Sequence, residues 1–278
     1  QAVNRLQDEE WTLSLIRQAR ESGFRSVSVD LIYGLPKQTA ASFTHTLESV
    51  VRAKPDRIAA YSYAHLPEMF RSQRLINQED LPTAAEKLAL LTRTVEFLTG
   101  HGYEYIGMDH FALPEDDLVR ARHNGSLHRN FQGYSTHAEL DLVGLGVSAI
   151  GKVGNSYAQS IKLRQAYYEA IEAGRLPVLR GIELTPDDIL RREVIHALMC
   201  GGVADMRRIE ARHGINFPVY FARELGEMRK LAADGLVEMD DDFIRVTPRG
   251  RFLLRPIAMP FDGYLAAYLA EQRFSKVI

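Results

Sequence analysis

The sequence contains a single cysteine, Cys200, in 278 residues. One thiol cannot form an internal disulfide. By itself it also cannot supply the several thiolates that a cysteine-rich zinc site or an iron–sulfur cluster requires. The simplest interpretation is a reducing, cytoplasmic environment. Long apolar runs are absent as well, since none approaches the ~18 residues that cross a bilayer, and we therefore expect no membrane-spanning segment.

The sequence has no excess of charge of either sign. Lys and Arg number 34 against 36 Asp and Glu, a formal net charge of −2. A polybasic nucleic-acid binder needs a clear cationic excess to neutralise phosphates, so this class is disfavoured. The hydrophobic share of 46% and the charged share of 25% are ordinary for a globular protein, and the length suits one large or two medium domains.

Helical and strand patterns alternate in the first half of the chain. Helical spacing covers residues 8–22, 40–53 and 83–100, and strand patterns cover 27–33, 58–63 and 103–107. Thr83 and Glu86 have the spacing of a capping box. This alternation predicts an α/β fold with a parallel sheet, as part of a barrel or of a doubly wound sheet.

The middle of the chain shows weaker patterns. Residues 108–134 are polar with little periodicity, which predicts a long loop. Residues 140–150 are apolar and glycine-rich, which predicts a strand followed by a tight turn. Residues 161–173 have helical spacing.

The pattern changes from Thr185 onward. An N-cap, a proline and two acids open a helix over residues 185–200. Further helices are predicted near 205–213 and 218–233, and short strands at 235–239 and 244–247. Three helices followed by a hairpin are typical of a winged helix, and we place a domain boundary near Arg180.

Two residue sets could bind a ligand. Asp30 lies in an apolar strand, so its carboxylate is expected to be buried and either paired with a cation or set beside a ligand at the rim of the sheet. Residues 127–134 (Leu-His-Arg-Asn-Phe-Gln-Gly-Tyr) combine cationic, amide and aromatic groups, which would suit an anionic planar ligand. A solvated polar loop is the alternative for this second set.

Common catalytic motifs are missing. There is no Walker A loop, no His-Glu-x-x-His, no Gly-x-Ser-x-Gly and no Gly-x-Gly-x-x-Gly. The predicted winged helix could bind DNA through residues 218–233, but acidic residues offset the basic ones there, and a packing role is favoured.

Several motifs resemble those of one family, the oxygen-independent coproporphyrinogen III oxidases. They comprise Val3-Asn4-Arg5, residues 30–39 (Asp-Leu-Ile-Tyr-Gly-Leu-Pro-Lys-Gln-Thr), 63–67 (Tyr-Ala-His-Leu-Pro), 107–112 (Gly-Met-Asp-His-Phe-Ala), 127–134, 146–150 (Gly-Val-Ser-Ala-Ile) and 273–278 (Arg-Phe-Ser-Lys-Val-Ile). The likeness runs over nearly the whole chain. The motif at residues 30–36 is shared with related radical-SAM proteins, whereas the motifs at 107–112 and 127–134 are far more specific to this family.

The resemblance implies a radical S-adenosylmethionine enzyme of haem biosynthesis. Its activity would be the conversion of two propionates of coproporphyrinogen III to vinyl groups, with a [4Fe–4S] cluster and two S-adenosylmethionine molecules as cofactors. The implied fold is a partial (β/α) barrel over residues 1–180 and a helical, winged-helix-like domain over 181–278. By motif position, Arg5, Asp30 and Ala64 would contact the second S-adenosylmethionine, and Ile150 the first.

One departure from the family pattern limits what this chain is expected to do. The family's Cys-x₃-Cys-x₂-Cys motif does not occur here. We therefore expect a C-terminal portion of such an enzyme that binds no cluster and is inactive by itself, and no catalytic residue is assigned. Because the substrate carries four propionates, His128, Arg129 and Arg273 are the residues expected to hold it. We expect a monomer that binds neither nucleic acid nor membrane.

Two other functions remain open at this point. A haem chaperone on the same scaffold would bind haem through histidine, although the specific run at 107–112 disfavours it. A winged-helix regulator would bind DNA with a strong salt dependence, which the acidic turn at 240–242 disfavours.

Overall fold

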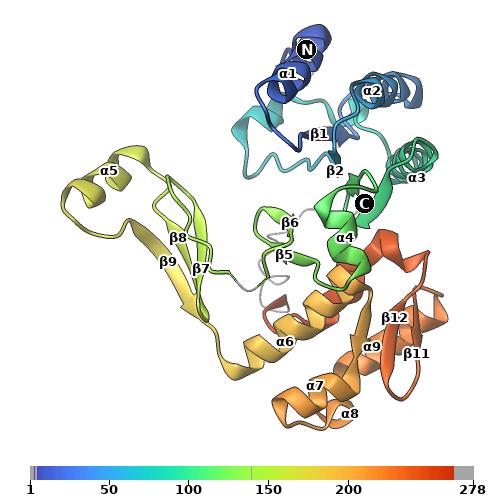
Figure 1. Ribbon diagram of the computed structural model, residues 1–278, viewed down its shortest axis with the longest axis vertical. Helices are drawn as coiled ribbons and strands as arrows, with labels where there is room; N and C mark the ends of the chain where they lie inside the picture. Colours follow the sequence, from blue (N-terminus) through green and yellow to red (C-terminus); the bar gives the residue numbers. More distant parts are fainter. Residues whose placement is uncertain (1–2, 4, 139, 266–278) are drawn as a thin grey trace. The chain divides into compact units, whose positions relative to one another are not determined.

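The computed structural model describes residues 3, 5–138 and 140–265. They form two compact units, one ending at Asn124 and one covering Gly125–Leu265, which are described separately (Figure 1). The boundary expected near Arg180 falls within strand β9 (Val178–Glu183) of the second unit, so the division into 1–180 and 181–278 stays a prediction. Among the described residues, no helix combines the length and apolar character of a bilayer span.

The first unit is built around a four-stranded sheet in the order β1-β2-β4-β3. Its elements are α1 (Glu9–Glu21), β1 (Ser28–Tyr33), α2 (Ala40–Ala53), β2 (Arg57–Ser62), α3 (Ala84–Gly100), β3 (Glu104–Gly107), β4 (His110–Ala112) and α4 (Asp117–His123). The short 3₁₀ segments η1 (Arg71–Leu75) and η2 (Gln78–Asp80) connect β2 to α3. Helices α1 to α3 and strands β1 to β3 follow the sequence prediction closely.

Local hydrogen bonds explain where the helices begin. At the start of α3, Thr83 Oγ1 accepts from the Glu86 amide at 3.3 Å, and the Glu86 carboxylate accepts from the Thr83 amide at 2.7 Å. The predicted capping box is therefore confirmed. The same amide hydrogen bond is the main reason that the pKa of Glu86 is lowered. Asp8 caps α1 in the same way, accepting from the Trp11 amide at 2.7 Å.

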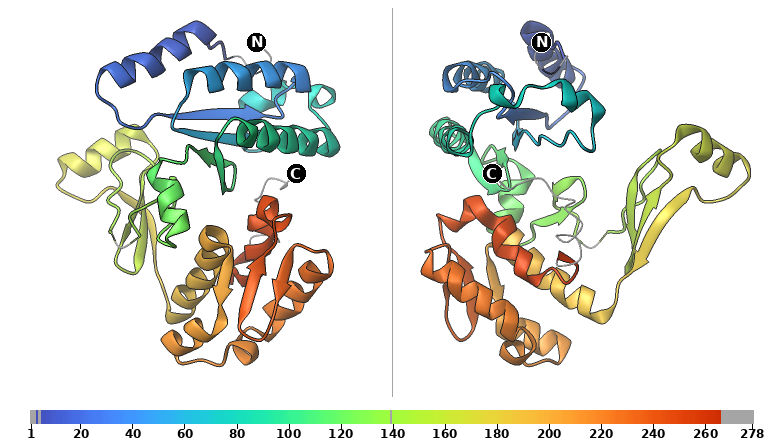
Figure 2. Two further views of the ribbon diagram at one scale, coloured as in Figure 1. Left: turned by 45° about the vertical axis from the view of Figure 1, so that its right-hand side comes forward. Right: turned by 180° about the vertical axis from the view of Figure 1, so that it is seen from behind.

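The main core of this unit lies on one face of the sheet. α2 and α3 lie on the same side of it (Figure 2), and the core there consists of Leu31, Tyr33, Phe43, Leu47, Val50, Ile58, Ala60, Leu90, Leu91, Leu98, Tyr103 and Phe111. β1 and β2 are parallel, as expected when a helix such as α2 connects two strands. On the opposite face α4 packs against β3, where His123 contacts Glu104 at 3.0 Å and Ile106 is buried.

Two sequence predictions for this part were wrong. The sheet is mixed rather than fully parallel, because β4 pairs antiparallel with both β2 and β3 and separates them. Residues 108–134 are not a long loop, since they form β4, α4 and the first hairpin of the second unit. Tight turns and three-residue strands are too short to produce a recognisable sequence period, and for this reason the pattern looked irregular.

The second unit contains three small sheets and a helical region. It starts with β5 (His128–Asn130), β6 (Gly133–Ser135), β7 (Ile150–Val153), β8 (Ser156–Ser160), α5 (Arg164–Glu172), β9 and α6 (Pro186–His196). The π-helical turn η3 (Ala197–Gly201), β10 (Val203–Asp205), α7 (Met206–His213), α8 (Phe217–Tyr220), α9 (Ala222–Ala233), β11 (Val237–Met239) and β12 (Phe243–Val246) follow. The last elements are η4 (Gly250–Leu253), α10 (Leu254–Ala258) and η5 (Met259–Phe261).

The predicted winged helix is confirmed. α6, α7 and α9 pack with the three-stranded sheet β10-β12-β11 around a core that includes Val194, Phe217, Phe221, Met228 and Ile244. The sequence missed β10 and merged α8 with α9, because each missed element is only three or four residues long. Basic groups of the wing are neutralised internally, since Arg207 contacts Asp242 at 2.8 Å and Arg245 pairs with Asp240.

Residues 140–150 do not form the predicted strand. Only Leu142 makes an isolated bridge, to Lys152, and the segment otherwise runs as irregular chain into β7. Gly144 has a specific packing role here. A Cβ at this position would lie 2.8 Å from the Ile150 carbonyl oxygen, so only glycine allows the two backbone segments to approach this closely.

Candidate functional site

The face of the first unit's sheet opposite α2 and α3 carries Asp30. Asp30 pairs with Ala59 across β1 and β2, and Ala59 pairs with His110 across β2 and β4. Paired residues project from the same face, so the carboxylate and the imidazole flank a small alanine. Asp30 is exposed, and the expectation of a buried carboxylate was wrong. β1 is an edge strand of the sheet, so Asp30 has a neighbouring strand on one side only.

His110 has a defined ring orientation on this face. Its Nδ1 lies 2.7 Å from the carbonyl oxygen of Met108, and since a carbonyl can only accept, Nδ1 is the donor. The ring of Tyr61 meets the His110 ring edge-on, with centroids 6.0 Å apart. These contacts fix the imidazole beside Ala59, which is itself buried.

Two loops leave the carboxyl ends of β1 and β2, where parallel sheets hold their ligands. The Gln38 amide holds the first loop by accepting from the Gly34 amide at 2.6 Å and donating to the Ile32 carbonyl at 3.2 Å. In the second loop the carbonyl of Ala64 accepts from Gln73 at 3.1 Å. Beside it, Nδ1 of His65 is buried and has no hydrogen-bond partner among the described residues.

The other residues predicted to contact S-adenosylmethionine lie apart from these loops in the chain. Arg5 is exposed and belongs to no helix or strand. Ile150 is half-buried at the first position of β7, in the second unit. Asp30 pairs with Ala59 across the sheet, and Ala59 precedes Ala64 by five residues. A ligand that touched both Asp30 and Ala64 would therefore extend roughly 16 Å along the direction of β2. Arg273 lies outside the described residues.

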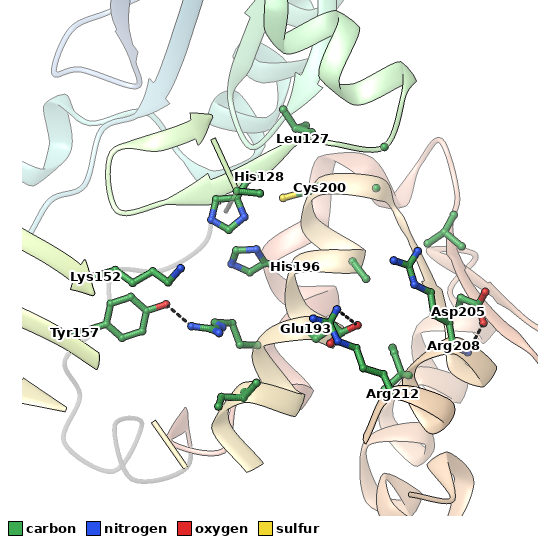
Figure 3. A pocket seen from close by; sticks show the side chains of 18 residues that line it. Leu127, His128, Lys152, Tyr157, Glu193, His196, Cys200, Asp205, Arg208 and Arg212 are labelled. Carbon is green, nitrogen blue, oxygen red and sulfur yellow. Dashed lines mark hydrogen bonds and ion pairs between the residues drawn. The ribbon is translucent and has the colours of Figure 1, made fainter. Parts of the chain in front are cut away.

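The second unit has a pocket of about 490 Å³. It lies between the β5 hairpin, β7 and β8, and the helices α6 and α7, as Figure 3 shows. Its polar and ionisable lining consists of His128, Lys152, Tyr157, Arg192, Glu193, His196, Cys200, Asp205, Arg208 and Arg212. Cationic side chains therefore outnumber carboxylates in this lining.

Two histidines meet in this pocket. The rings of His128 and His196 have centroids 4.6 Å apart and planes tilted by 47°. Burial, followed by the nearby positive charges of His128, Arg192, Arg129 and Lys152, lowers the pKa of His196 to about 4. His196 is therefore neutral near pH 7, and its ring sits among groups of positive charge.

The carboxylates of the pocket are already engaged. Glu193 accepts from Arg212 at 3.3 Å and contacts His213 Nε2 at 2.8 Å. Asp205 caps α7 by accepting from the Arg208 amide at 2.9 Å. Part of the positive charge of the Lys and Arg side chains in this pocket is therefore not balanced by a carboxylate.

Arg129 follows His128 in the same strand. Its guanidinium carbon lies 5.2 Å from the centroid of the Tyr134 ring, and Tyr134 donates to the Met199 carbonyl at 3.0 Å. Nη1 of Arg129 is buried and has no hydrogen-bond partner among the described residues. A buried guanidinium donor in this state is costly unless a ligand completes it.

Of the residues that line this pocket, sequence reasoning named His128 but not Lys152, Tyr157, Arg192 or His196. One signal was present, because Arg192, His196 and Cys200 recur every four residues and therefore share one side of a continuous helix. Lys152 and Tyr157 face each other across the β7–β8 hairpin and gave no such signal. Their participation depends on how the hairpin folds back toward α6.

Cys200 is a poor candidate for metal binding or nucleophilic chemistry. Burial raises the pKa of its thiol to about 12, against a smaller lowering by Arg129. Among the described residues, no group of three or more His, Cys, Asp or Glu side chains could hold a metal ion.

Comparison with known proteins gives a consistent family. The HemN C-terminal domain matches residues 184–253. The oxygen-independent coproporphyrinogen III oxidase of Thermostichus vulcanus is 44% identical over 278 residues, covering 100% of this chain and 85% of that protein. The chain belongs to this family. The Escherichia coli K12 oxidase is 49% identical over 276 residues, covering 99% of this chain, and the Pseudomonas aeruginosa oxidase is 48% identical over 277 residues, covering 100%.

The fold of the oxygen-independent coproporphyrinogen III oxidases is shown by a solved structure. Coproporphyrinogen III oxidase (HemN) from Escherichia coli, described as a radical SAM enzyme, matches with a TM-score of 0.91 at 49% identity, over 95% of this chain and 61% of that one. The first unit is thus part of a radical-SAM barrel. The chain spans about 60% of the length of the E. coli and P. aeruginosa oxidases.

The residues of this chain fit one of the implied cofactors and not the other. A [4Fe–4S] cluster needs several thiolates, and one buried thiol does not provide them. S-adenosylmethionine fits better, because Asp30 offers an exposed carboxylate and His65 offers an unpartnered ring nitrogen next to Ala64.

Proposed function

We propose that this chain is part of a radical-SAM enzyme that decarboxylates two propionates of coproporphyrinogen III, giving protoporphyrinogen IX in haem biosynthesis. The observation that carries the proposal is the 0.91 TM-score at 49% identity to a radical SAM coproporphyrinogen III oxidase. The intact enzyme's [4Fe–4S] cluster and S-adenosylmethionine supply the radical that removes a hydrogen from the propionate. The part described here serves binding and orientation.

Asp30, Arg5, Ala64 and Ile150 are proposed to contact S-adenosylmethionine. Asp30 would accept hydrogen bonds from ribose hydroxyls or from the ammonium group, which its exposure permits. Arg5 would pair with a carboxylate, and Ala64 would offer its backbone at the exit of β2. Ile150 would supply an apolar contact.

His128 and Arg129, together with Arg273, are proposed to hold propionates of the substrate. Support comes from the buried, unpartnered Nη1 of Arg129, since a carboxylate is the ligand that a guanidinium binds best. We also propose that the enzyme is a cytoplasmic monomer that binds neither nucleic acid nor membrane. The reducing cytoplasm suits a family whose cluster is held by cysteine thiolates.

The test uses the full-length gene product, purified and reconstituted without oxygen. We expect about four iron and four sulfide per chain, as one [4Fe–4S] cluster requires, and release of CO₂ from coproporphyrinogen III. Asp30→Asn should weaken S-adenosylmethionine binding about tenfold while leaving the iron content unchanged. A full-length protein that holds iron but releases no CO₂ would contradict the proposed activity.

A further inference from the structure

We propose that the pocket of the second unit is a carboxylate subsite, in which Arg192 and Lys152 bind an anionic arm of the substrate against the ring of His196. This inference rests on the proposed function for the identity of the substrate, and it adds residues that the family motifs do not mark. We call this site the α6 pocket, defined by His128, Lys152, Tyr157, Arg192 and His196.

The charge distribution of the α6 pocket favours an anion. Among the described residues, neither Arg192 nor Lys152 has an ion-pair partner, whereas Glu193 pairs with Arg212 and Asp205 caps α7. Arg192 donates a hydrogen bond to a neutral group, the Tyr157 hydroxyl, at 3.3 Å. A bound carboxylate would supply the negative charge that the protein itself does not provide here.

The state of His196 is consistent with such an environment. His128, Arg192, Arg129 and Lys152 all disfavour its protonated form. Positive charges from three separate elements, β5, β7 and α6, therefore converge on one ring. A bound anion would offset this repulsion, because an opposite charge nearby favours the charged form of each cation.

Aromatic contacts hold the pocket walls together. The rings of Phe131 and Tyr157 meet at 90° with centroids 5.2 Å apart, which ties the turn after β5 to β8. Tyr157 in turn contacts Arg192 on α6. In Figure 3, Lys152 extends toward the two imidazole rings from the β7 side. The cations are thus positioned by packing in the absence of any ligand.

The volume agrees with this assignment. A pocket of about 490 Å³ is within the ~300–1,000 Å³ range of small-molecule sites, and it exceeds what one carboxylate arm would fill. Part of a ring could therefore enter together with its arm. Because Lys152 and Arg192 line the pocket, an apolar ligand without carboxylates would leave these cations desolvated and unpaired.

The test measures binding of coproporphyrin III and of its uncharged tetramethyl ester to the full-length protein, by fluorescence quenching. Arg192→Gln and Lys152→Gln should each weaken coproporphyrin III binding by about tenfold or more and leave ester binding within about twofold. Arg212→Gln is the matched control. It removes a cation from the same pocket, but one that Glu193 already neutralises, so both affinities should stay within about twofold.

Each alternative result has a distinct meaning. Unchanged coproporphyrin III binding in both variants would overturn the subsite, as would equal losses for the acid, the ester and the Arg212→Gln control. If the wild type releases no CO₂ from coproporphyrinogen III but shows the expected binding pattern, the proposed function fails and the carboxylate subsite stands. If Arg192→Gln does not fold, Lys152→Gln decides, because Lys152 has no ion-pair partner among the described residues.

Discussion

The imidazole rings of His128 and His196 lie 4.6 Å apart, one from the β5 hairpin and one from the end of α6. The pair connects a motif that the family shares, residues 127–134, to a helix in the segment matched by the HemN C-terminal domain. His128 was expected to bind substrate, and His196 was not considered. Their contact places the α6 side chains Arg192 and His196 next to the proposed propionate-binding residues.

Acid should destabilise the second unit through His196. Its pKa is about 4 in the folded chain and near 6.5 when unfolded, so the unfolded state binds more protons between these values. The free energy of unfolding should therefore rise with pH from 4 to 6.5, by on the order of 3 kcal/mol. Chemical denaturation across this range measures it. His196→Gln should flatten the profile, and an identical slope in that variant would contradict the assignment.

Cys200 should react slowly in the folded protein. With a pKa of about 12, its thiolate fraction at pH 8 is on the order of 10⁻⁴, compared with about a quarter for an ordinary thiol. Since the chain has one cysteine, iodoacetamide labelling reports it without ambiguity. We expect labelling more than about a hundredfold slower in buffer than in guanidinium chloride. Comparable rates would mean that the thiol is accessible and ionised.

Loss of Arg191 should be among the most destabilising changes in the winged helix. Arg191 contacts the buried carboxylate of Glu224 at 2.8 Å. Arg191→Met would leave that carboxylate uncompensated, at a cost of about 3–5 kcal/mol in the free energy of unfolding. Adding Glu224→Leu should recover most of the loss, and urea denaturation measures both. The control Lys230→Ala removes an exposed pair with Glu227 and should cost under ~1 kcal/mol.

Gly144→Ala should destabilise the segment that leads to Ile150. The added methyl group would lie 2.8 Å from the Ile150 carbonyl oxygen and 3.1 Å from the Ala149 Cβ, so the backbone must shift. We expect a loss of about 1–3 kcal/mol in thermal or urea unfolding. Gly226→Ala is the control, because that site lies inside α9 with open space around it and should gain about 0.5–1 kcal/mol. Equal effects at both sites would contradict the packing argument.

Arg129→Ala should raise the KM for coproporphyrinogen III in the full-length enzyme by about tenfold or more, because a guanidinium pairs with a carboxylate through two hydrogen bonds. kcat should change less if Arg129 serves binding. Steady-state CO₂ release measures both constants. An unchanged KM would remove Arg129 from the substrate site, and Arg129→Lys should restore only part of the affinity, since an ammonium lacks the planar fork.

Elements of the first unit were predictable where the signal was local. The capping residues Thr83 and Glu86 act within three positions, and α2 matches its predicted bounds of 40–53. β4 was not predictable, because three residues are too few to show an alternation of apolar and polar side chains. Its place between β2 and β3 also depends on pairing with strands that are distant in the sequence. The exposure of Asp30 was not predictable for a similar reason. A strand pattern shows that side chains alternate between the two faces of a sheet, but it does not show which face a helix covers.

The sequence by itself determined the family, the order of the main elements and the winged helix, because motifs, caps and hydrophobic periods are encoded over a few neighbouring residues. It also determined that one thiol cannot hold an iron–sulfur cluster. Only the tertiary structure decided that His196, Lys152 and Arg192 share a pocket with His128, that Glu193 pairs with Arg212, and that Asp30 is exposed. These three features depend on contacts between segments that are distant in the sequence. A local sequence pattern does not show which charges meet or which side chains are buried in such contacts.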